Sequence, residues 1–256
     1  MTRPARQPEA AGPARFRSTA RTHVGGRALN EDRVLERPDV GLWAVADGMG
    51  GHMAGDVAST MVVEALGRVA RFGSGYAYLN DVAAQLQAVN RQLLEGCGGG
   101  GGRPGLMGST VVALLAHEGY YACVWAGDSR AYLLRGGRLT RLTHDHSLVQ
   151  EMVDSGALTA DQARSHPRAN VITRAVGVAD PLLLEKRHAP IEAGDIFLLC
   201  SDGLTGTMRD EEIEERLLRG ELDQAADDLL GLALGRGARD NVSLVLVSAY
   251  SEGLRQ

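Results

Sequence analysis

Four aspartates beside apolar segments of the chain have the spacing of candidate metal ligands. Three of them follow an apolar run and stand between two small residues, in Ala46-Asp47-Gly48, Gly127-Asp128-Ser129 and Ser201-Asp202-Gly203. The fourth, Asp240, comes shortly before the apolar run Val242–Ala249. If these runs are strands of one buried core, the four carboxylates can meet at its rim.

Clustered carboxylates repel one another and take up protons unless positive charge lies between them. Lys186 is the only lysine in the chain, so a hard cation is the natural partner. Oxygen ligands from aspartate, a backbone carbonyl and water suit magnesium or manganese, whereas zinc prefers histidine and cysteine. Gly48 has no side chain, which would let its carbonyl approach the ion closely. A single Asp-Gly pair more often marks a turn. The repetition of the pattern at the ends of apolar runs, however, favours a metal site.

A second segment adds an arginine and two acids. Arg27 precedes Asn30-Glu31-Asp32 and a short strand predicted at Val34-Leu35. An arginine in this place can hold phosphate oxygens in a bidentate manner while the acids face metal-bound water. Taken alone, the segment would more often be a solvated turn.

The elements that must position these residues are short strands and amphipathic helices in separate blocks. The apolar runs predict strands at Val40–Ala46, Val111–Ala116, Tyr120–Ala126, Ile196–Cys200 and Val242–Ala249. Helical spacing predicts helices at 56–71, 79–93, 147–156, 210–219 and 222–234, and a capping-box pattern starts a short one at Thr159. Blocks of strands and helices favour an α+β fold with antiparallel sheets over a doubly wound parallel sheet.

Composition bounds the class of protein. The 256 residues are 44% hydrophobic with a net charge of −5, which fits one globular domain over residues 15–256 and gives no basic surface for nucleic acid. Residues 1–14 contain three prolines and are predicted to be a disordered tail. The longest apolar runs fall far short of the roughly 20 residues of a membrane helix. Three cysteines without CxxC spacing predict neither a disulfide framework nor a zinc ribbon, so a cytoplasmic location is expected.

The chain resembles the metal-dependent protein phosphatases of type 2C, which are serine/threonine phosphatases, in their compact bacterial form. The resemblance covers about residues 20–249 and follows the family's motif order. It rests on Arg27, Asn30-Glu31-Asp32, Asp47-Gly48-Met49-Gly50-Gly51-His52, Gly108-Ser109-Thr110, Gly127-Asp128-Ser129-Arg130, His166-Pro167, Asn170-Val171-Ile172-Thr173-Arg174, Ser201-Asp202-Gly203-Leu204 and Arg239-Asp240-Asn241.

The resemblance implies a four-layer α-β-β-α sandwich with manganese or magnesium ions at one end of two antiparallel sheets. Asp47 would bridge two cations, with the Gly48 carbonyl on one and Asp202 and Asp240 on the other. Asp128, together with Asp202, matches the place where bacterial relatives bind a third cation. Two bridged cations lower the pKa of a shared water and align the attacking and leaving oxygens.

The resemblance also assigns catalytic roles outside the metal ligands. Asp32 would hydrogen-bond metal-bound water and Arg27 would bind the substrate phosphate. Animal relatives have a histidine where this chain has Met49, so His52 is the nearest substitute as a general acid, although it could also only shape its loop. Residues 147–177 match the flap beside the active site.

The implied activity is hydrolysis of phosphoserine and phosphothreonine in proteins by in-line attack of water. The implied partners are phosphorylated proteins, including a cognate serine/threonine kinase of a signalling pathway or its substrates. We expect a monomer that binds no nucleic acid and has no membrane segment.

Two alternatives compete with this interpretation. Cys97 and Arg103 have the cysteine-x5-arginine spacing of tyrosine phosphatases, but that chemistry needs a strand before the cysteine and a helix from the arginine. The second is a phosphatase-like protein that binds phosphorylated partners without turnover. Such proteins usually lack metal carboxylates, whereas Asp47, Asp202 and Asp240 are all present here.

Overall fold

The structure is a computed structural model that describes residues 15–50, 54–70, 73–98 and 107–250. The predicted tail 1–14 lies outside these residues, and the division into a tail and one domain stays a prediction. No helix within the described ranges has the length and apolar character needed to cross a membrane.

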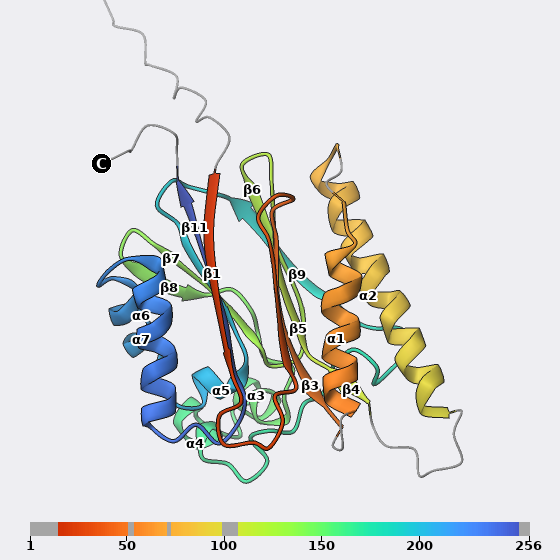
Figure 1. The fold of residues 1–256 in the computed structure, drawn as a ribbon. Helices are drawn as coiled ribbons and strands as arrows, with labels where there is room; N and C mark the ends of the chain where they lie inside the picture. The colour runs from red at the N-terminus through yellow and green to blue at the C-terminus, as the bar shows by residue number, and fades with distance from the viewer. Residues whose placement is uncertain (1–14, 51–53, 71–72, 99–106, 251–256) are drawn as a thin grey trace, which may run out of the picture.

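Two antiparallel sheets form the centre of the molecule (Figure 1). The first sheet has the order β1-β11-β10-β7-β8, with β1 at Arg15–His23, β11 at Val242–Tyr250, β10 at Ile196–Cys200, β7 at Arg130–Arg135 and β8 at Arg138–Arg141. The second has the order β2-β3-β5-β6-β9, with β2 at Asp32–Arg37, β3 at Leu42–Met49, β5 at Val111–His117, β6 at Tyr120–Ala126 and β9 at Glu185–Pro190. A two-residue strand, β4 at Gly108–Ser109, pairs with the end of β3.

Helices cover the outer face of each sheet. On the second sheet lie α1 (Ala54–Gly67) and α2 (Gly75–Gly98), and on the first lie α6 (Asp210–Leu217) and α7 (Leu222–Gly235). Three short helices gather at one end of the sandwich: α3 (Leu148–Asp154), α4 (Ala160–Arg164) and α5 (Asp202–Thr205) (Figure 1). The predicted α+β class and the α-β-β-α layering are confirmed.

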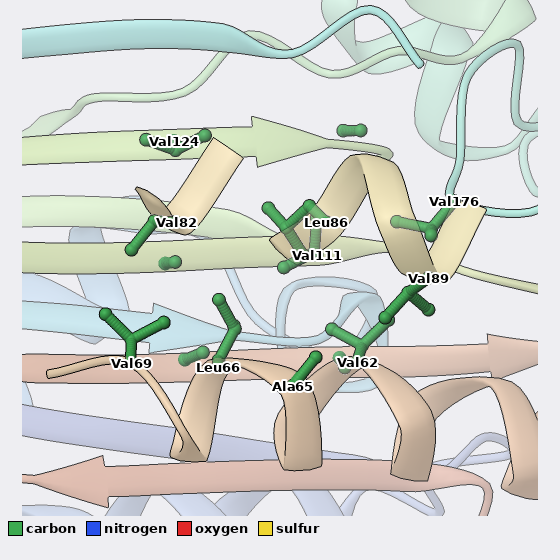
Figure 2. Packing of buried hydrophobic residues seen from close by; sticks show 14 of the residues in the cluster. Val62, Ala65, Leu66, Val69, Val82, Leu86, Val89, Val111, Val124 and Val176 are labelled. Atoms are coloured by element: carbon green, nitrogen blue, oxygen red, sulfur yellow. The ribbon is translucent and has the colours of Figure 1, made fainter. Parts of the chain in front are cut away.

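The strands alternate between two buried faces, because successive side chains of a strand point to opposite sides. In β3, Ala44 and Ala46 pack under α1 and α2, while Trp43 and Val45 pack against the other sheet. Figure 2 shows the helix-facing layer, where valine and leucine side chains of α1 and α2 meet those of the sheet. Asp47 continues the series of Trp43 and Val45, so it belongs to the face between the sheets.

The long apolar runs were predicted as strands, and four strands that begin with a charged residue were not. The missed strands β1, β7, β8 and β9 all begin or end with charged residues, and β1 alternates arginine with smaller residues. Arg17 and Arg21 of β1 pair with acids of α7, so this strand packs under a helix through ion pairs. The prediction that Asp47 follows its strand was wrong, because β3 continues to Met49.

The capping box at Thr159 is confirmed: the Thr159 hydroxyl accepts a hydrogen bond from the Gln162 backbone N–H, and the Gln162 side chain accepts one from the Thr159 N–H. Helix α5 was not predicted. It begins at Asp202, directly after β10, and therefore places this aspartate at the start of a buried turn.

Candidate active site

The predicted aspartates converge at one end of the sandwich, between the two sheets. Asp32 begins β2 and pairs in register with Asp47 of β3. Burial raises the pKa of Asp47 well above its usual value, and the charges of Asp32, Asp202, Asp128 and Asp240 raise it further. The cluster therefore contains more negative charge than the described protein around it neutralises.

The backbone of Asp47 is fixed from the neighbouring strand. Its N–H donates to Thr110 Oγ1 at 3.1 Å, and its carbonyl accepts from the Thr110 N–H at 2.8 Å and from Ser109 Oγ at 3.1 Å. The Thr110 hydroxyl also meets Ser129 Oγ at 2.7 Å, next to Asp128. The Gly108-Ser109-Thr110 motif therefore links two of the predicted metal ligands.

Gly48 is held in a crowded backbone contact. A Cβ atom at this position would lie 2.0 Å from the Gly55 carbonyl oxygen and 2.7 Å from that of Glu31. The Gly48 N–H donates to the same Glu31 carbonyl at 3.2 Å. The glycine is thus required by the packing of β3 against the start of α1, a reason that the sequence did not reveal.

Asp32 is a buried acid with 1% of its surface exposed. Its Oδ2 atom accepts a hydrogen bond from Ser201 Oγ at 2.8 Å, while Oδ1 has no partner. Burial raises the pKa of Asp32 to about 6, against the opposing effect of hydrogen bonds from Ser243 and Ser201. Such a group can accept or release a proton near neutral pH.

Asp202 and Asp128 are also acids whose pKa values are raised by burial. Burial, followed by the charge of Asp240, raises the pKa of Asp202 to about 6. Burial also raises the pKa of Asp128 well above its usual value, with Asp202 as the next cause. Both acids have a buried Oδ1 atom without a hydrogen-bond partner.

The unpartnered oxygens of this cluster fit a hard cation. Among the described residues, the buried carboxylate oxygens that lack a partner are those of Glu31, Asp32, Asp128 and Asp202. Buried charged oxygens are rarely left unpaired, and acid oxygens are the ligands that magnesium and manganese accept. Among the described residues, no three His, Cys, Asp or Glu side chains are arranged so that they could hold a metal ion by themselves. Water would complete the coordination, as is usual for magnesium.

Glu31 was predicted only as one of two acids that face metal-bound water, without a named role. Its Oε1 atom is buried without a partner and lies where a Cβ atom of Gly55 would approach it to 2.6 Å. The signal in the sequence was its place beside Asp32, which alone does not distinguish a ligand from a solvated acid.

Arg27 lies at the rim on an exposed loop. Its Nη2 atom donates to Asp240 Oδ2 at 2.6 Å, and its side chain is 54% exposed. Asn241 anchors this loop, because its side-chain amide donates to the carbonyls of Val24 and Leu29 and accepts from the Glu31 N–H. The structure thus pairs the predicted phosphate ligand with a predicted metal ligand.

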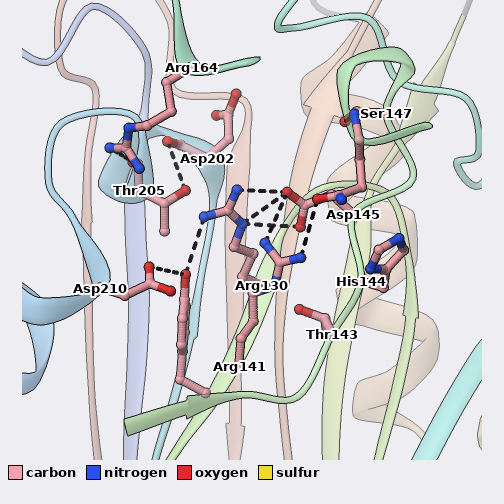
Figure 3. A network of polar contacts seen from close by, with 12 residues as sticks. Arg130, Arg141, Thr143, His144, Asp145, Ser147, Arg164, Asp202, Thr205 and Asp210 are labelled. Atoms are coloured by element: carbon pink, nitrogen blue, oxygen red, sulfur yellow. Dashed lines mark hydrogen bonds and ion pairs between the residues drawn. The ribbon is translucent and has the colours of Figure 1, made fainter. Parts of the chain in front are cut away.

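The predicted flap, residues 147–177, contacts the segment that follows Asp202. Its Arg164 donates to the carbonyls of Thr205 and Met208, at 3.1 and 2.9 Å. A cavity of about 450 Å³ lies beside it, lined by Asp128 and Asp202 as well as by flap residues. Figure 3 shows the polar network of this cavity, in which Arg130 pairs with Asp145.

Two predicted groups are placed differently or not at all. His52 lies outside the described residues, so its role as a general acid stays a prediction. Cys97 belongs to the last turn of α2, not to the loop after a strand, and Arg103 lies outside the described residues. The backbone arrangement of a cysteine phosphatase is therefore not found before Cys97.

Comparison with known proteins identifies the family. Residues 19–232 match the family described as protein phosphatase 2C. The chain belongs to this family. The predicted resemblance to metal-dependent serine/threonine phosphatases of bacterial type is thus confirmed.

Individual members of the family agree with the chain over most of its length. The chain is 41% identical over 242 residues to the serine/threonine protein phosphatase PstP of Mycobacterium tuberculosis. The matched region covers 90% of this chain but only 44% of PstP. The solved structure of PppA, a key regulatory component of T6SS in Pseudomonas aeruginosa, has 42% identity and a TM-score of 0.84, covering 94% of this chain and 99% of PppA.

A further solved structure, the PstP catalytic domain in complex with two manganese ions, has 39% identity and a TM-score of 0.78. It covers 92% of this chain and 99% of that domain. A relative with the same fold therefore binds two manganese ions.

Proposed function

We propose that the chain is a phosphoprotein phosphatase that hydrolyses phosphoserine and phosphothreonine by in-line attack of a water bridging two divalent cations. The observation that carries the proposal is the rim of buried acids with unpartnered oxygens, centred on Asp47. It is supported by membership of the protein phosphatase 2C family and by the two manganese ions of the PstP domain.

In this proposal Asp47 bridges the two cations, the Gly48 carbonyl binds one of them, and Asp202 and Asp240 bind the other. Asp128 and Asp202 hold a third. Two bound cations, manganese or magnesium, would lower the pKa of the attacking water and neutralise charge on the phosphoryl group. The Glu31 Oε1 atom, which is buried without a partner beside Gly55, is a further candidate ligand.

The other residues bind the substrate and handle protons. Asp32, with a pKa of about 6, would orient the attacking water through its free Oδ1 atom. A cation on Asp240 would compete with Arg27 for that carboxylate. The exposed guanidinium would then be free to bind the substrate phosphate in a bidentate manner.

The substrates in this proposal are phosphorylated proteins, including a cognate serine/threonine kinase or its targets. The names of the relatives, which are serine/threonine protein phosphatases, support this class. We also propose that the protein acts in the cytoplasm as a monomer, and a mass measurement in solution would test the second point.

The test of the proposal is phosphate release from phosphothreonine, phosphoserine and phosphotyrosine peptides with manganese, magnesium or a chelator. We expect release from the first two peptides with metal and none with chelator. Release that continues with chelator and disappears in Cys97→Ser would favour cysteine chemistry. Peptide binding without release under any metal would favour the binding protein.

A further inference from the structure

His146 lies at the base of the flap and contacts the turn that carries Asp128. The residue is 5% exposed, and it bonds to Gly127 twice. Its backbone N–H donates to the Gly127 carbonyl at 3.0 Å, and its ring atom Nδ1 accepts from the Gly127 N–H at 3.1 Å. Both backbone polar groups of Gly127 are therefore held by one residue.

The hydrogen bond at Nδ1 indicates which ring nitrogen carries the proton. Because Nδ1 accepts a hydrogen bond, the ring proton belongs on Nε2, which lies 3.1 Å from Glu185 Oε1. Arg174 donates to the same carboxylate oxygen at 3.0 Å. The ring also stacks on Trp125, with ring centroids 6.3 Å apart and an angle of 14° between the planes. The hydrogen bond from Gly127 and the nearby Glu185 carboxylate favour the tautomer with the proton on Nε2, and the stacking on Trp125 fixes the orientation of the ring.

Gly127 has little freedom of its own. Its φ angle is +120°, and a Cβ atom there would lie 2.6 Å from the Thr110 side chain. The next residue is Asp128, whose buried Oδ1 atom has no partner. A change in the Gly127 peptide would therefore move this carboxylate directly.

His146 is also bonded to the far end of the flap. Its carbonyl accepts from the Thr173 N–H at 2.8 Å, and its neighbour Ser147 forms an isolated β-bridge with Ile172. His146 thus contacts the Asp128 turn and the far part of the flap, and it directly precedes the near end of the flap.

We infer that His146 is a positioning residue that holds Asp128 in place for a divalent cation by fixing the Gly127 peptide, and that it ties this placement to the flap. The inference rests on the proposed function, because it takes Asp128 as a cation ligand. Partners in the outer shell of a metal site commonly change metal affinity by about 10- to 100-fold when removed.

Two amide substitutions separate the roles of the ring nitrogens. In His146→Asn the side-chain oxygen can take the place of Nδ1 and accept from Gly127. In His146→Gln the amide reaches the place of Nε2 instead and leaves the Gly127 N–H without a partner. His144→Gln is the matched control, because His144 lies two residues away, is half exposed and pairs with Asp154.

The experiment is a calorimetric titration of the chelator-treated protein with manganese in the absence of substrate, together with thermal unfolding. We expect His146→Gln to weaken the weakest manganese step by about 10-fold or more, and His146→Asn to stay within about 3-fold of wild type. His144→Gln should bind as wild type does. Both His146 variants should unfold at similar temperatures.

Glu185→Ala provides a second route, since it removes the acceptor of the Nε2 proton at a half-exposed position. We expect it to weaken the same manganese step by about 10-fold, the lower end of the outer-shell range. Wild-type affinity in both His146→Gln and Glu185→Ala would overturn the inference while leaving the proposed function intact. Equal weakening by the Asn and Gln variants, with equal loss of stability, would overturn it as well. A wild-type protein that binds no manganese would instead overturn the proposed function, and the inference with it.

Discussion

At the scale of single residues, the site consists of acids whose surroundings disfavour their charged form. Asp32 and Asp202 have pKa values raised to about 6, and the pKa values of Asp47 and Asp128 are raised well above their usual value. The main cause is burial, which penalises the charged form of each acid. A scaffold that only needed stability would place neutral side chains here. Perturbed acids in one cleft are typical of a functional site.

Asp32→Asn should stabilise the chelator-treated protein at pH 8 and slow the enzyme. The amide is of the same shape and can still accept from Ser201, but it carries no charge to bury. A carboxyl pKa raised from 3.8 to about 6 corresponds to roughly 1–3 kcal/mol of lost stability. Thermal unfolding with chelator measures the gain, and a loss of stability in this variant would contradict the assigned environment.

Arg27→Lys should raise KM for a phosphopeptide by about 10-fold, because lysine cannot bind phosphate in a bidentate manner. The side chain is 54% exposed, so the free energy of unfolding should change by less than about 0.5 kcal/mol. Steady-state kinetics and denaturant unfolding test the two parts. An unchanged KM would exclude Arg27 from phosphate binding.

The residues that do chemistry were more predictable than those that hold them. The aspartates stand next to apolar runs of the sequence, which is a local signal. Asn241 and His146 act through bonds to Leu29 and Gly127, and these contacts exist only after distant segments pack together. Glu31 was visible in the sequence, but only the fold shows that its oxygen is buried without a partner.

At the scale of elements, the strands that read as continuous apolar runs were predicted from the sequence, and strands that begin with a charged residue, such as β7 and β9, were not. The strands β3, β5, β6, β10 and β11 are buried on both faces and read as continuous apolar runs. By contrast, β9 is a charged strand at the edge of its sheet and has the composition of a loop. Its pairing with β6 depends on tertiary contact, which no local pattern reports.

Gly203→Ala should disrupt the junction of β10 and α5. A Cβ atom there would lie 1.9 Å from the Asn241 carbonyl, which is backbone and cannot move aside cheaply. We expect a loss of more than about 2 kcal/mol, at the upper end of the usual range. Gly231→Ala is the control, since it lies in α7 with open space around its Cβ position and should stabilise by about 0.5–1 kcal/mol. Equal unfolding temperatures in the two variants would contradict the packing described.

At the scale of the whole molecule, the acid cluster should set how stability depends on pH. A carboxyl whose pKa is higher in the folded than in the unfolded state lowers the free energy of unfolding as pH rises from the unfolded-state pKa to the folded-state pKa. For Asp32 and Asp202 this window runs from 3.8 to about 6. Surface acids act in the opposite direction at lower pH, since Arg236 lowers the pKa of Glu212 to about 2.

The chelator-treated protein should therefore unfold at a lower temperature at pH 7 than at pH 5. Manganese should raise the unfolding temperature at pH 7 more than at pH 5, because it binds the ionised acids and stabilises the folded state by mass action. Differential scanning calorimetry at the two pH values, with and without manganese, measures both effects. An unfolding temperature that rises with pH in chelator would contradict the clustering of these acids.

The central claim is that the buried acid rim holds the cations that hydrolyse the phosphoester. It is tested most directly by the rate of phosphate release from a phosphothreonine peptide as a function of manganese concentration, for wild type, Asp202→Ala and the exposed control Asp154→Ala. We predict saturable activation in wild type and in the control, and a loss on the order of 100-fold in Asp202→Ala. Equal manganese dependence in all three proteins, or full release without metal, would contradict the claim.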